Sequence, residues 1–396
     1  MTAISSEDQI LSFGIGCYSF EAPDADHLLM QNQSGTYTVH DWASDVESTL
    51  NSIPSLDEVV VSGFDAVRGD NAPTWRNPYE QILNDLPYNS MHRGGRLRPH
   101  PVRGQIRFTV NIPAHIQSEV FPRYTPLAGN RFEVDIRYGY GMPVAFVRAP
   151  EGEVSPSMSV AVVREFLRSE FETRLGESPI KFTCMGPSPM WNDCFVRWGA
   201  SEQSQFVEVE IDDPPGYRQI TFKIQHRSQG KTLTDAYERL KDEMQDELTY
   251  YYELVSRNSL LDLRDSFVES ELGEIVAHHQ RGGVRAWLWR RFVGERRTNN
   301  LLLEILATDS EHRRSMGSAR SDWEEILARS TFRAFDVAFE RELNERLSDH
   351  LENARAVASL LNERHSRETQ LVAVVFASLL GGVAGSAITA LVRVLS

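Results

Sequence analysis

The sequence predicts an α+β cytosolic domain followed by a helical domain with a long stalk helix and one C-terminal transmembrane helix. Three observations lead to this fold class. All 18 prolines lie at or before Pro215, so the last 181 residues contain none. The 63 residues from Ser318 to Leu380 contain neither glycine nor proline, and the 22 residues from Leu371 to Val392 carry no charge. Because proline interrupts helices and an uncharged apolar run of this length can cross a bilayer, the second half is expected to be helical and to enter the membrane.

The α+β domain is predicted over residues 1–228. Short runs of β-branched and aromatic residues, separated by proline and glycine, predict its strands. These runs are 10–20, 58–62, 105–111, 131–138, 144–148, 180–185, 206–211 and 217–224. Between them, apolar residues recur at helical spacing over 41–53 and 157–174. The mixture indicates an α+β domain and leaves the order of the strands open.

A helical domain is predicted over 229–317, beginning with an amphipathic helix over 232–257 and continuing in shorter helices. The stalk helix is expected over 318–370. Apolar residues from Phe335 to Leu351 are spaced by four, and four residues turn a helix by about 400°. Such a stripe moves around the helix faster than a heptad seam. We therefore expect the stalk to pack on several neighbours rather than in a two-stranded coiled coil.

The transmembrane helix is predicted over 371–395, since about 20 apolar residues cross the hydrocarbon core. Small residues recur every four positions in two adjoining rows, and such rows let transmembrane helices approach closely. The expected pore or oligomer interface consists of Ala377, Ser378, Gly381, Gly382, Gly385, Ser386 and Thr389. Two rows indicate neighbours on both sides, and hence a homo-oligomer in the membrane. The alternative is that small residues are simply common in such helices.

The first residues of the chain, Met1 to Asp8, carry neither the basic patch nor the apolar run of a secretory signal. Together with the uncharged run near the other end, this predicts a single-pass protein of the cell inner membrane. Its N-terminal domain is expected to lie in the cytoplasm.

Two basic clusters stand out in a chain with a formal net charge of −15. The first cluster, residues 92–107, holds five arginines, two histidines and no acid, and its glycines and prolines predict a loop. The second cluster, residues 281–297, holds six arginines together with Trp287 and Trp289. Guanidinium groups bind phosphate in bidentate fashion and stack on bases, so the expected partner is a nucleotide or oligonucleotide. The candidate ligand-binding residues are Arg93, Arg96, Arg98, Arg103, Arg107, Arg285, Arg290 and Arg291.

Both clusters also have a structural interpretation. The first can neutralise residues 1–90, which hold 14 Asp and Glu against Arg68 and Arg76. The second can be an amphipathic connector whose tryptophans belong to a core. Known catalytic signatures are absent from the sequence, and Gly14-Ile-Gly16 lacks the third glycine and the following helix of a dinucleotide site. The sequence therefore argues against an enzyme, and we expect neither a metal nor a cofactor.

The order of the segments resembles the layout of CorA-type magnesium transporters over residues 232–396. The passage from Leu360 to Phe376 is similar in texture to the stalk-to-membrane transition of that family. The Gly-Met-Asn motif and the second transmembrane helix of the family are missing, so no family residue is carried over to this sequence. The layout also resembles membrane effectors of bacterial anti-phage systems of the CBASS and Hailong kinds. In those systems a nucleotide signal controls a membrane-disrupting oligomer.

Three functional hypotheses follow. The first is an oligomeric tail-anchored effector or channel, gated by an anionic ligand and acting in anti-phage defence. The second is a relative of CorA-like divalent cation transporters. The third is a tail-anchored enzyme or scaffold with a passive anchor. A ring of helices with a hydroxyl-lined axis would favour the first two, and a cleft lined by carboxylates or histidines would favour the third.

Overall fold

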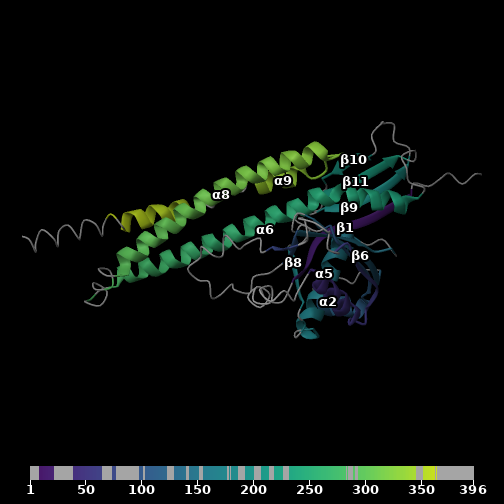
Figure 1. Ribbon diagram of the computed structural model, residues 1–396, viewed down its shortest axis with the longest axis horizontal. Helices are drawn as coiled ribbons and strands as arrows, with labels where there is room; N and C mark the ends of the chain where they lie inside the picture. Colours follow the sequence, from purple (N-terminus) through teal and green to yellow (C-terminus); the bar gives the residue numbers. More distant parts are fainter. Residues whose placement is uncertain are drawn as a thin grey trace, which may run out of the picture. The chain divides into compact units, whose positions relative to one another are not determined.

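Figure 1 shows the computed structural model of the chain. The structure describes residues 9–21, 39–64, 74–76, 98–100, 103–122, 129–139, 142–150, 155–175, 178, 180–185, 192–199, 207–213, 218–225, 232–281, 283, 289, 293–344, 351–361 and 363. The chain divides into two compact units. One comprises Met1–Ser256 with Ser321–Leu343, and the other comprises Arg257–Arg320 with Asn344–Ser396. The first contains a β-sheet with helices and the second is helical, which confirms an α+β part followed by a helical region.

One large sheet forms the centre of the first unit. Its described strands are β1 (Gln9–Glu21), β2 (Leu56–Ser62), β5 (Gln105–Asn111), β6 (Arg131–Gly139), β7 (Met142–Arg148), β8 (Lys181–Met185), β9 (Asn192–Gly199), β10 (Val207–Asp212) and β11 (Arg218–Gln225). Their order is β10-β11-β9-β1-β7-β6-β5-β2, with β8 paired to β1. The pairing is antiparallel except between β9 and β11, which run parallel. All eight predicted strands are confirmed, whereas β9 was not predicted.

A second, small ladder pairs β3 (Thr74–Arg76) with β4 (Arg98–His100). The predicted loop of the first basic cluster therefore contains a short strand at Arg98. The prediction of a loop was wrong at this point because Pro99 lies opposite Trp75 in a two-stranded ladder, where an edge position tolerates a residue without an amide hydrogen.

The long central strand β1 pairs with β9, β7 and β8 in turn along its length. Its Gly14 lies directly beneath α5 (Pro156–Thr173), and a Cβ atom at Gly14 would come within 2.3 Å of the carbonyl oxygen of Pro156. At Gly16 a Cβ atom would lie 2.7 Å from a methyl group of Val160. The Gly-Ile-Gly sequence is therefore explained by close packing of a helix on a strand, without a phosphate-binding role.

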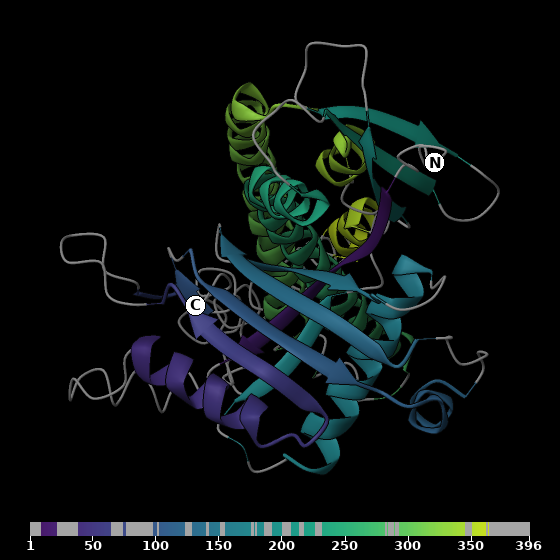
Figure 2. The same cartoon turned by 90° about the vertical axis from the view of Figure 1, so that its right-hand side faces the viewer.

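The helices α2 (Val39–Asn51) and α5 cover one face of the sheet (Figure 2). Along β5 and β6, every second residue points into this apolar core, including Phe108, Val134 and Ile136. Trp42 of α2 is fully buried there and meets the ring of Tyr138 edge-on. The short helix α4 (Ala114–Val120) follows β5. Burial of one face leaves the alternate residues of β5 and β6 on the opposite face of the sheet.

The amphipathic helix expected over 232–257 is longer than predicted, because α6 runs from Leu233 to Gln280. Its first part, up to Ser256, belongs to the first unit. There Tyr250 stacks on Phe339 of α9 (Asp336–Leu343), and Phe339 in turn stacks on Trp323 of α8 (Glu295–Arg329). These aromatic contacts join parts of three helices to the sheet unit.

The prediction of one stalk helix over 318–370 was wrong in part. The helix α8 crosses residue 318 but ends at Arg329, and residues 330–335 are not helical. The interruption places Phe332 edge-on against Phe222 of β11, with ring centroids 5.5 Å apart, while Ser330 donates its hydroxyl to the carbonyl of Phe332. Burial of the phenylalanine ring and this local hydrogen bond outweigh the helical propensity of the segment.

In the second unit, α6, α8 and a helix over 351–361 share a small core. Its buried members are Val268, Ile275, Leu301, Ile305, Leu351, Ala354 and Ala358. The apolar residues expected on the stalk at 351, 354, 358 and 361 all pack in or against this core. The expectation that they contact several neighbours is therefore confirmed for this part of the segment.

Across the described part of the chain, none of the helices combines the length and the apolar character needed to span a bilayer. The predicted transmembrane helix over 371–395 lies outside the described residues.

Candidate functional site

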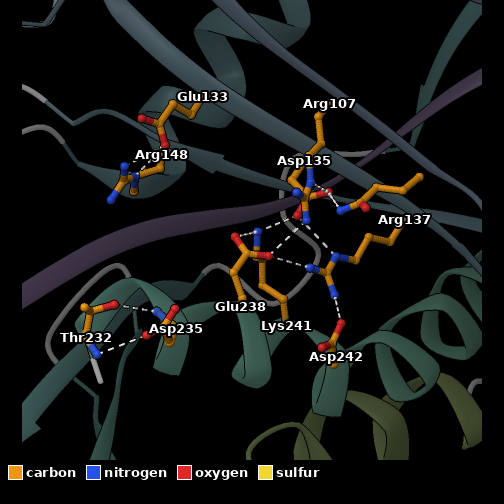
Figure 3. Close-up of polar contacts among 11 residues, drawn as sticks. Arg107, Glu133, Asp135, Arg137, Arg148, Thr232, Asp235, Glu238, Lys241 and Asp242 are labelled. Atoms are coloured by element: carbon orange, nitrogen blue, oxygen red, sulfur yellow. Dashed lines mark hydrogen bonds and ion pairs between the residues drawn. The ribbon is translucent and has the colours of Figure 1, made fainter. Parts of the chain in front are cut away.

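A cluster of charged side chains lies where β5 and β6 meet the first part of α6 (Figure 3). The strict alternation of β5 and β6 places Gln105, Arg107, Asp135 and Arg137 on the face opposite the apolar core. The register pairs Arg107 with Asp135 and Gln105 with Arg137. In the first of these two pairs, side chains of opposite charge thus lie directly across from one another on neighbouring strands.

The start of α6 is fixed by a reciprocal cap. The hydroxyl of Thr232 accepts a hydrogen bond from the amide of Asp235, and the carboxylate of Asp235 accepts one from the amide of Thr232, both at 3.1 Å. From there Glu238, Lys241 and Asp242 follow at spacings of three and one, so all three lie on one face of the helix. This face meets the charged side of the sheet.

Asp135 is the centre of the cluster. Its carboxylate accepts hydrogen bonds from Gln105 at 2.5 Å, from Arg137 at 3.2 Å and from the ammonium group of Lys241. The guanidinium of Arg107 lies 3.6 Å away. Burial alone would raise the pKa of Asp135, but the charges of Lys241 and Arg137 and the hydrogen bonds hold its pKa below the usual value. Asp135 is therefore ionised at neutral pH.

The carboxylates of α6 complete the cluster. The carboxylate of Glu238 forms ion pairs with side-chain nitrogens of Arg107 at 3.0 Å, Arg137 at 3.0 Å and Lys241 at 2.8 Å. Asp242 pairs with Arg137. Three cations thus face three carboxylates, and the side chains of Lys241 and Arg137 are only 3% and 5% exposed. Buried charges of this kind are tolerated because each has a partner of opposite sign.

The first basic cluster is described at three of its five candidate arginines. Arg98 lies in β4, while Arg103 and Arg107 contact α6. Arg103 pairs with Asp246 at 3.0 Å, one turn beyond Asp242. The acidic partners of Arg103 and Arg107 therefore come from α6 and, for Arg107, also from Asp135 of β6. Among the described residues they do not come from residues 1–90, as the structural interpretation expected. The candidates Arg93 and Arg96 lie outside the described residues.

The second basic cluster, at the end of α6, is described only in part. Arg297 pairs with Glu274 at 3.2 Å, and Trp289 stacks on His278 with ring centroids 4.3 Å apart. Trp289 also packs against the core of the second unit, in agreement with the structural interpretation of this residue. The remaining sequence candidates lie outside the described residues, namely Arg285, Arg290, Arg291, Ala377, Ser378, Gly381, Gly382, Gly385, Ser386 and Thr389.

Sequence reasoning missed the centre of the site. Asp135, Arg137, Lys241 and Glu238 were not candidates, because each looked like an ordinary residue of a strand or of a solvated helix face. The signal that was present is the alternation of apolar and charged residues over 131–138, which predicts one apolar and one charged face of a strand. A charged strand in the middle of a large sheet needs a polar partner, and the helix that follows the last strand supplies it.

The described residues contain no group of three or more His, Cys, Asp or Glu side chains arranged to hold a metal ion. The ion-pair cluster also offers no paired nucleophile and base. What it offers is a charged contact between a sheet and a helix that continues beyond the first unit, next to apolar contacts such as the one between Phe13 of β1 and Tyr237 of α6. Two of its arginines, Arg103 and Arg107, remain accessible, with side chains 80% and 47% exposed.

Comparison with known protein families, curated proteins and solved structures finds no match to this chain.

Proposed function

We propose that the chain is an oligomeric, tail-anchored membrane effector or channel that opens when its α+β unit binds an anionic ligand, a nucleotide or oligonucleotide. The observation that carries the proposal is the position of Arg103 and Arg107. Both belong to the first basic cluster, residues 92–107, which contains no acid. Both also form ion pairs with carboxylates of α6. The helix α6 extends to Gln280 in the second unit, so a change at these arginines acts on an element shared by both units.

The conformational change would come from competition between the phosphate of the ligand and the carboxylates of α6 for the guanidinium groups of Arg103 and Arg107. A phosphate group can form bidentate, charge-assisted hydrogen bonds with arginine, whereas Asp246 and Glu238 each accept a single hydrogen bond from Arg103 and Arg107 in the free protein. The exposed pair of Arg103 and Asp246 is worth about 0–1 kcal/mol, so a phosphate displaces the carboxylate at low cost. Glu238 keeps Arg137 and Lys241 as partners when Arg107 turns to the ligand. The ligand thereby breaks the two exposed ion pairs between the arginines and α6. The buried ion pairs of Arg137 and Lys241 remain.

The membrane part of the proposal rests on the sequence. The uncharged run from Leu371 to Val392 would anchor the chain in the inner membrane, with the α+β unit in the cytoplasm. The rows of small residues would bring copies together, and the hydroxyl groups of Ser378, Ser386 and Thr389 would line a wet axis. A nucleotide-controlled membrane oligomer of this layout suits anti-phage defence.

Binding of a labelled single-stranded oligonucleotide to the full-length protein in detergent tests the ligand part of the proposal. We expect binding that weakens as salt rises, because phosphate contacts release counterions. Changing Arg103 and Arg107 together to alanine should weaken binding and lower the slope of log K against log salt by about two. Asp246→Asn should tighten binding, because it frees Arg103 without removing it. Fluorescence anisotropy over a salt series measures all three.

Arg131→Ala is the matched control. Its side chain is 50% exposed, close to that of Arg107, and it pairs with Glu58 on the same sheet but outside the basic cluster. We expect its affinity to equal that of the wild type. Absence of binding to mononucleotides and oligonucleotides alike would reject the anionic ligand and favour a cation transporter or a scaffold with a passive anchor. Equal losses in the control and in the double variant would show a nonspecific effect of surface charge.

A further inference from the structure

A cavity of about 210 Å³ opens beside α6 in the first unit, on the side of α8. Its described lining consists of Asp242, Glu243, Asp246, Glu247, Ile326, Arg329 and Ser330. The four carboxyl groups come from one stretch of α6, and Ile326 supplies an apolar wall. Arg329 does not neutralise this lining, because it pairs with Glu325 of its own helix. The cavity therefore has room for several water-sized groups, and carboxyl groups make up most of its polar lining.

Glu247 is the carboxyl group of this lining that needs a partner. The residue is 2% exposed, and neither of its oxygens has a hydrogen-bond partner among the residues that the structure describes. By contrast, Asp242 pairs with Arg137 of β6, Asp246 pairs with Arg103 just before β5, and Glu243 accepts a hydrogen bond from Thr331 at 3.1 Å. A buried polar group without a partner costs free energy, which a bound donor recovers.

The charged groups that face Glu247 come from three elements. Asp242, Glu243 and Asp246 lie on its own helix, Arg329 lies at the end of α8, and Asp336 begins α9, with Arg333 shortly before it. Burial and the charge of Asp336 raise the pKa of Glu247 and the charge of Arg333 opposes them, so that this pKa is about 8. The carboxyl group is therefore mostly protonated at neutral pH in the free protein.

The arrangement selects among cations. The carboxyl groups occupy positions i, i+1, i+4 and i+5 of α6, so they spread over about 7.5 Å along the helix axis instead of surrounding one point. Among the described residues no set of carboxylates converges as a metal ion requires. Separated carboxylates beside an apolar wall suit separated ammonium groups joined by methylene groups. The chemistry is that of a flexible organic cation.

We propose that this cavity binds an aliphatic diamine or polyamine, with one ammonium group donating hydrogen bonds to the buried carboxylate of Glu247. The other ammonium group pairs with Asp242, Glu243 or Asp246, whose carboxylates keep free lone pairs beside their present partners. The methylene groups lie against Ile326. This site does not involve the transmembrane segment, and it shares one residue with the function proposed above, Asp246, which is the partner of Arg103.

The number of protons released on binding distinguishes this site from a site made of ionised carboxylates. The ammonium group enters with its charge, the protonated carboxyl of Glu247 becomes a carboxylate, and its proton leaves to the solvent. At pH 7 close to one proton is released for each amine bound. A site made of carboxylates that are already ionised would release none.

Isothermal titration of the full-length protein with 1,4-diaminobutane and with spermidine tests the proposal. Titrations at pH 7 in two buffers of different ionisation enthalpy give the number of protons released. We expect saturable binding with release of close to one proton, and a loss of affinity of roughly 10- to 100-fold in Glu247→Gln. Glutamine has the shape of the protonated glutamate, so this variant is expected to fold. Glu324→Gln, an exposed acid of α8 outside the lining, is the control and should bind as the wild type does.

Three results would overturn the assignment. One is the absence of amine binding at salt concentrations matched for ionic strength. Another is binding without proton release, or with equal affinity in Glu247→Gln, which places the amine on exposed acids. The third is displacement of the amine by Mg²⁺ at similar concentrations, which makes the cavity a divalent cation site. Since none of these titrations contains a nucleotide or a membrane, they leave the proposed function untouched.

Discussion

Replacing Asp135 with alanine is expected to lower the free energy of unfolding by about 3–5 kcal/mol. The reason is the burial of its partners. Lys241 and Arg137 are almost fully buried, and Asp135 is the carboxylate that both contact from the sheet side. Removal of one member of a buried ion pair leaves an uncompensated charge in a poorly solvated place. The apolar core on the opposite face of the sheet would remain unchanged.

Chemical unfolding followed by circular dichroism measures the loss. Glu325→Ala is the control, because it removes an exposed pair with Arg329 on α8 and should cost less than about 1 kcal/mol. The double variant Asp135→Ala with Lys241→Met should lose less than the sum of the two single variants, since it removes a buried charge together with its partner. A loss in Asp135→Ala no larger than that of the control would mean that the cluster does not exist as described.

The same variant should change the response to acid. The pKa of Asp135 is lower in the folded protein than the ordinary value of about 3.9. Its contribution to stability is therefore fully present above about pH 4 and is lost as the pH falls through the folded pKa. Stability of the wild type should fall more steeply below pH 4 than that of Asp135→Ala.

Replacing Glu247 with glutamine is expected to raise the free energy of unfolding at pH 9 by about 2–4 kcal/mol. The pKa of Glu247 is about 8 in the folded protein against 4.5 ordinarily. Between these values the folded protein holds a proton that the unfolded chain has released, so stability falls as the pH rises from 4.5 through 8. The difference between pKa values of 4.5 and about 8 corresponds to about 5 kcal/mol at most. Glutamine cannot ionise, but its buried amide has no hydrogen-bond partner. This costs about 1–3 kcal/mol, which reduces the stabilisation by the same amount.

Unfolding curves at pH 5 and pH 9 decide this prediction, in buffers free of amines. The free energy of unfolding of the wild type should fall by several kcal/mol between the two pH values. That of Glu247→Gln should fall by about 2–4 kcal/mol less. Glu325→Gln should follow the wild type. Parallel pH dependence in the wild type and in Glu247→Gln would show that the carboxyl group is solvated or paired in the protein.

The sequence predicts the strands well and the long-range contacts poorly. Runs such as 131–138 alternate clearly, so their strands could be read from the chain, and α5 follows from helical periodicity. The strand β9 was missed because it begins with Asn192 and Asp193 and carries Arg197, residues that strands rarely favour. Its parallel pairing with β11 stabilises it in the sheet.

The helical part shows where local propensity is overridden. Freedom from glycine and proline after Ser318 predicts one continuous helix, yet residues 330–335 leave it because Phe332 and Phe335 are buried. The candidate site was predictable in one respect, the exposed arginines at 103 and 107. Its carboxylates on α6 were not, because no local pattern tells which helix covers the charged face of a sheet.

Release of a dye from lipid vesicles that contain the reconstituted full-length protein tests the central claim most directly. We predict that a single-stranded oligonucleotide or nucleotide that binds the α+β unit triggers release, and that vesicles without ligand stay closed. The variant Arg103→Ala with Arg107→Ala should respond only at higher ligand concentration, and Gly381→Leu with Gly385→Leu should bind ligand and release little dye. Release that is independent of ligand, or intact vesicles when the ligand is bound to the wild type, would contradict a ligand-gated membrane effector.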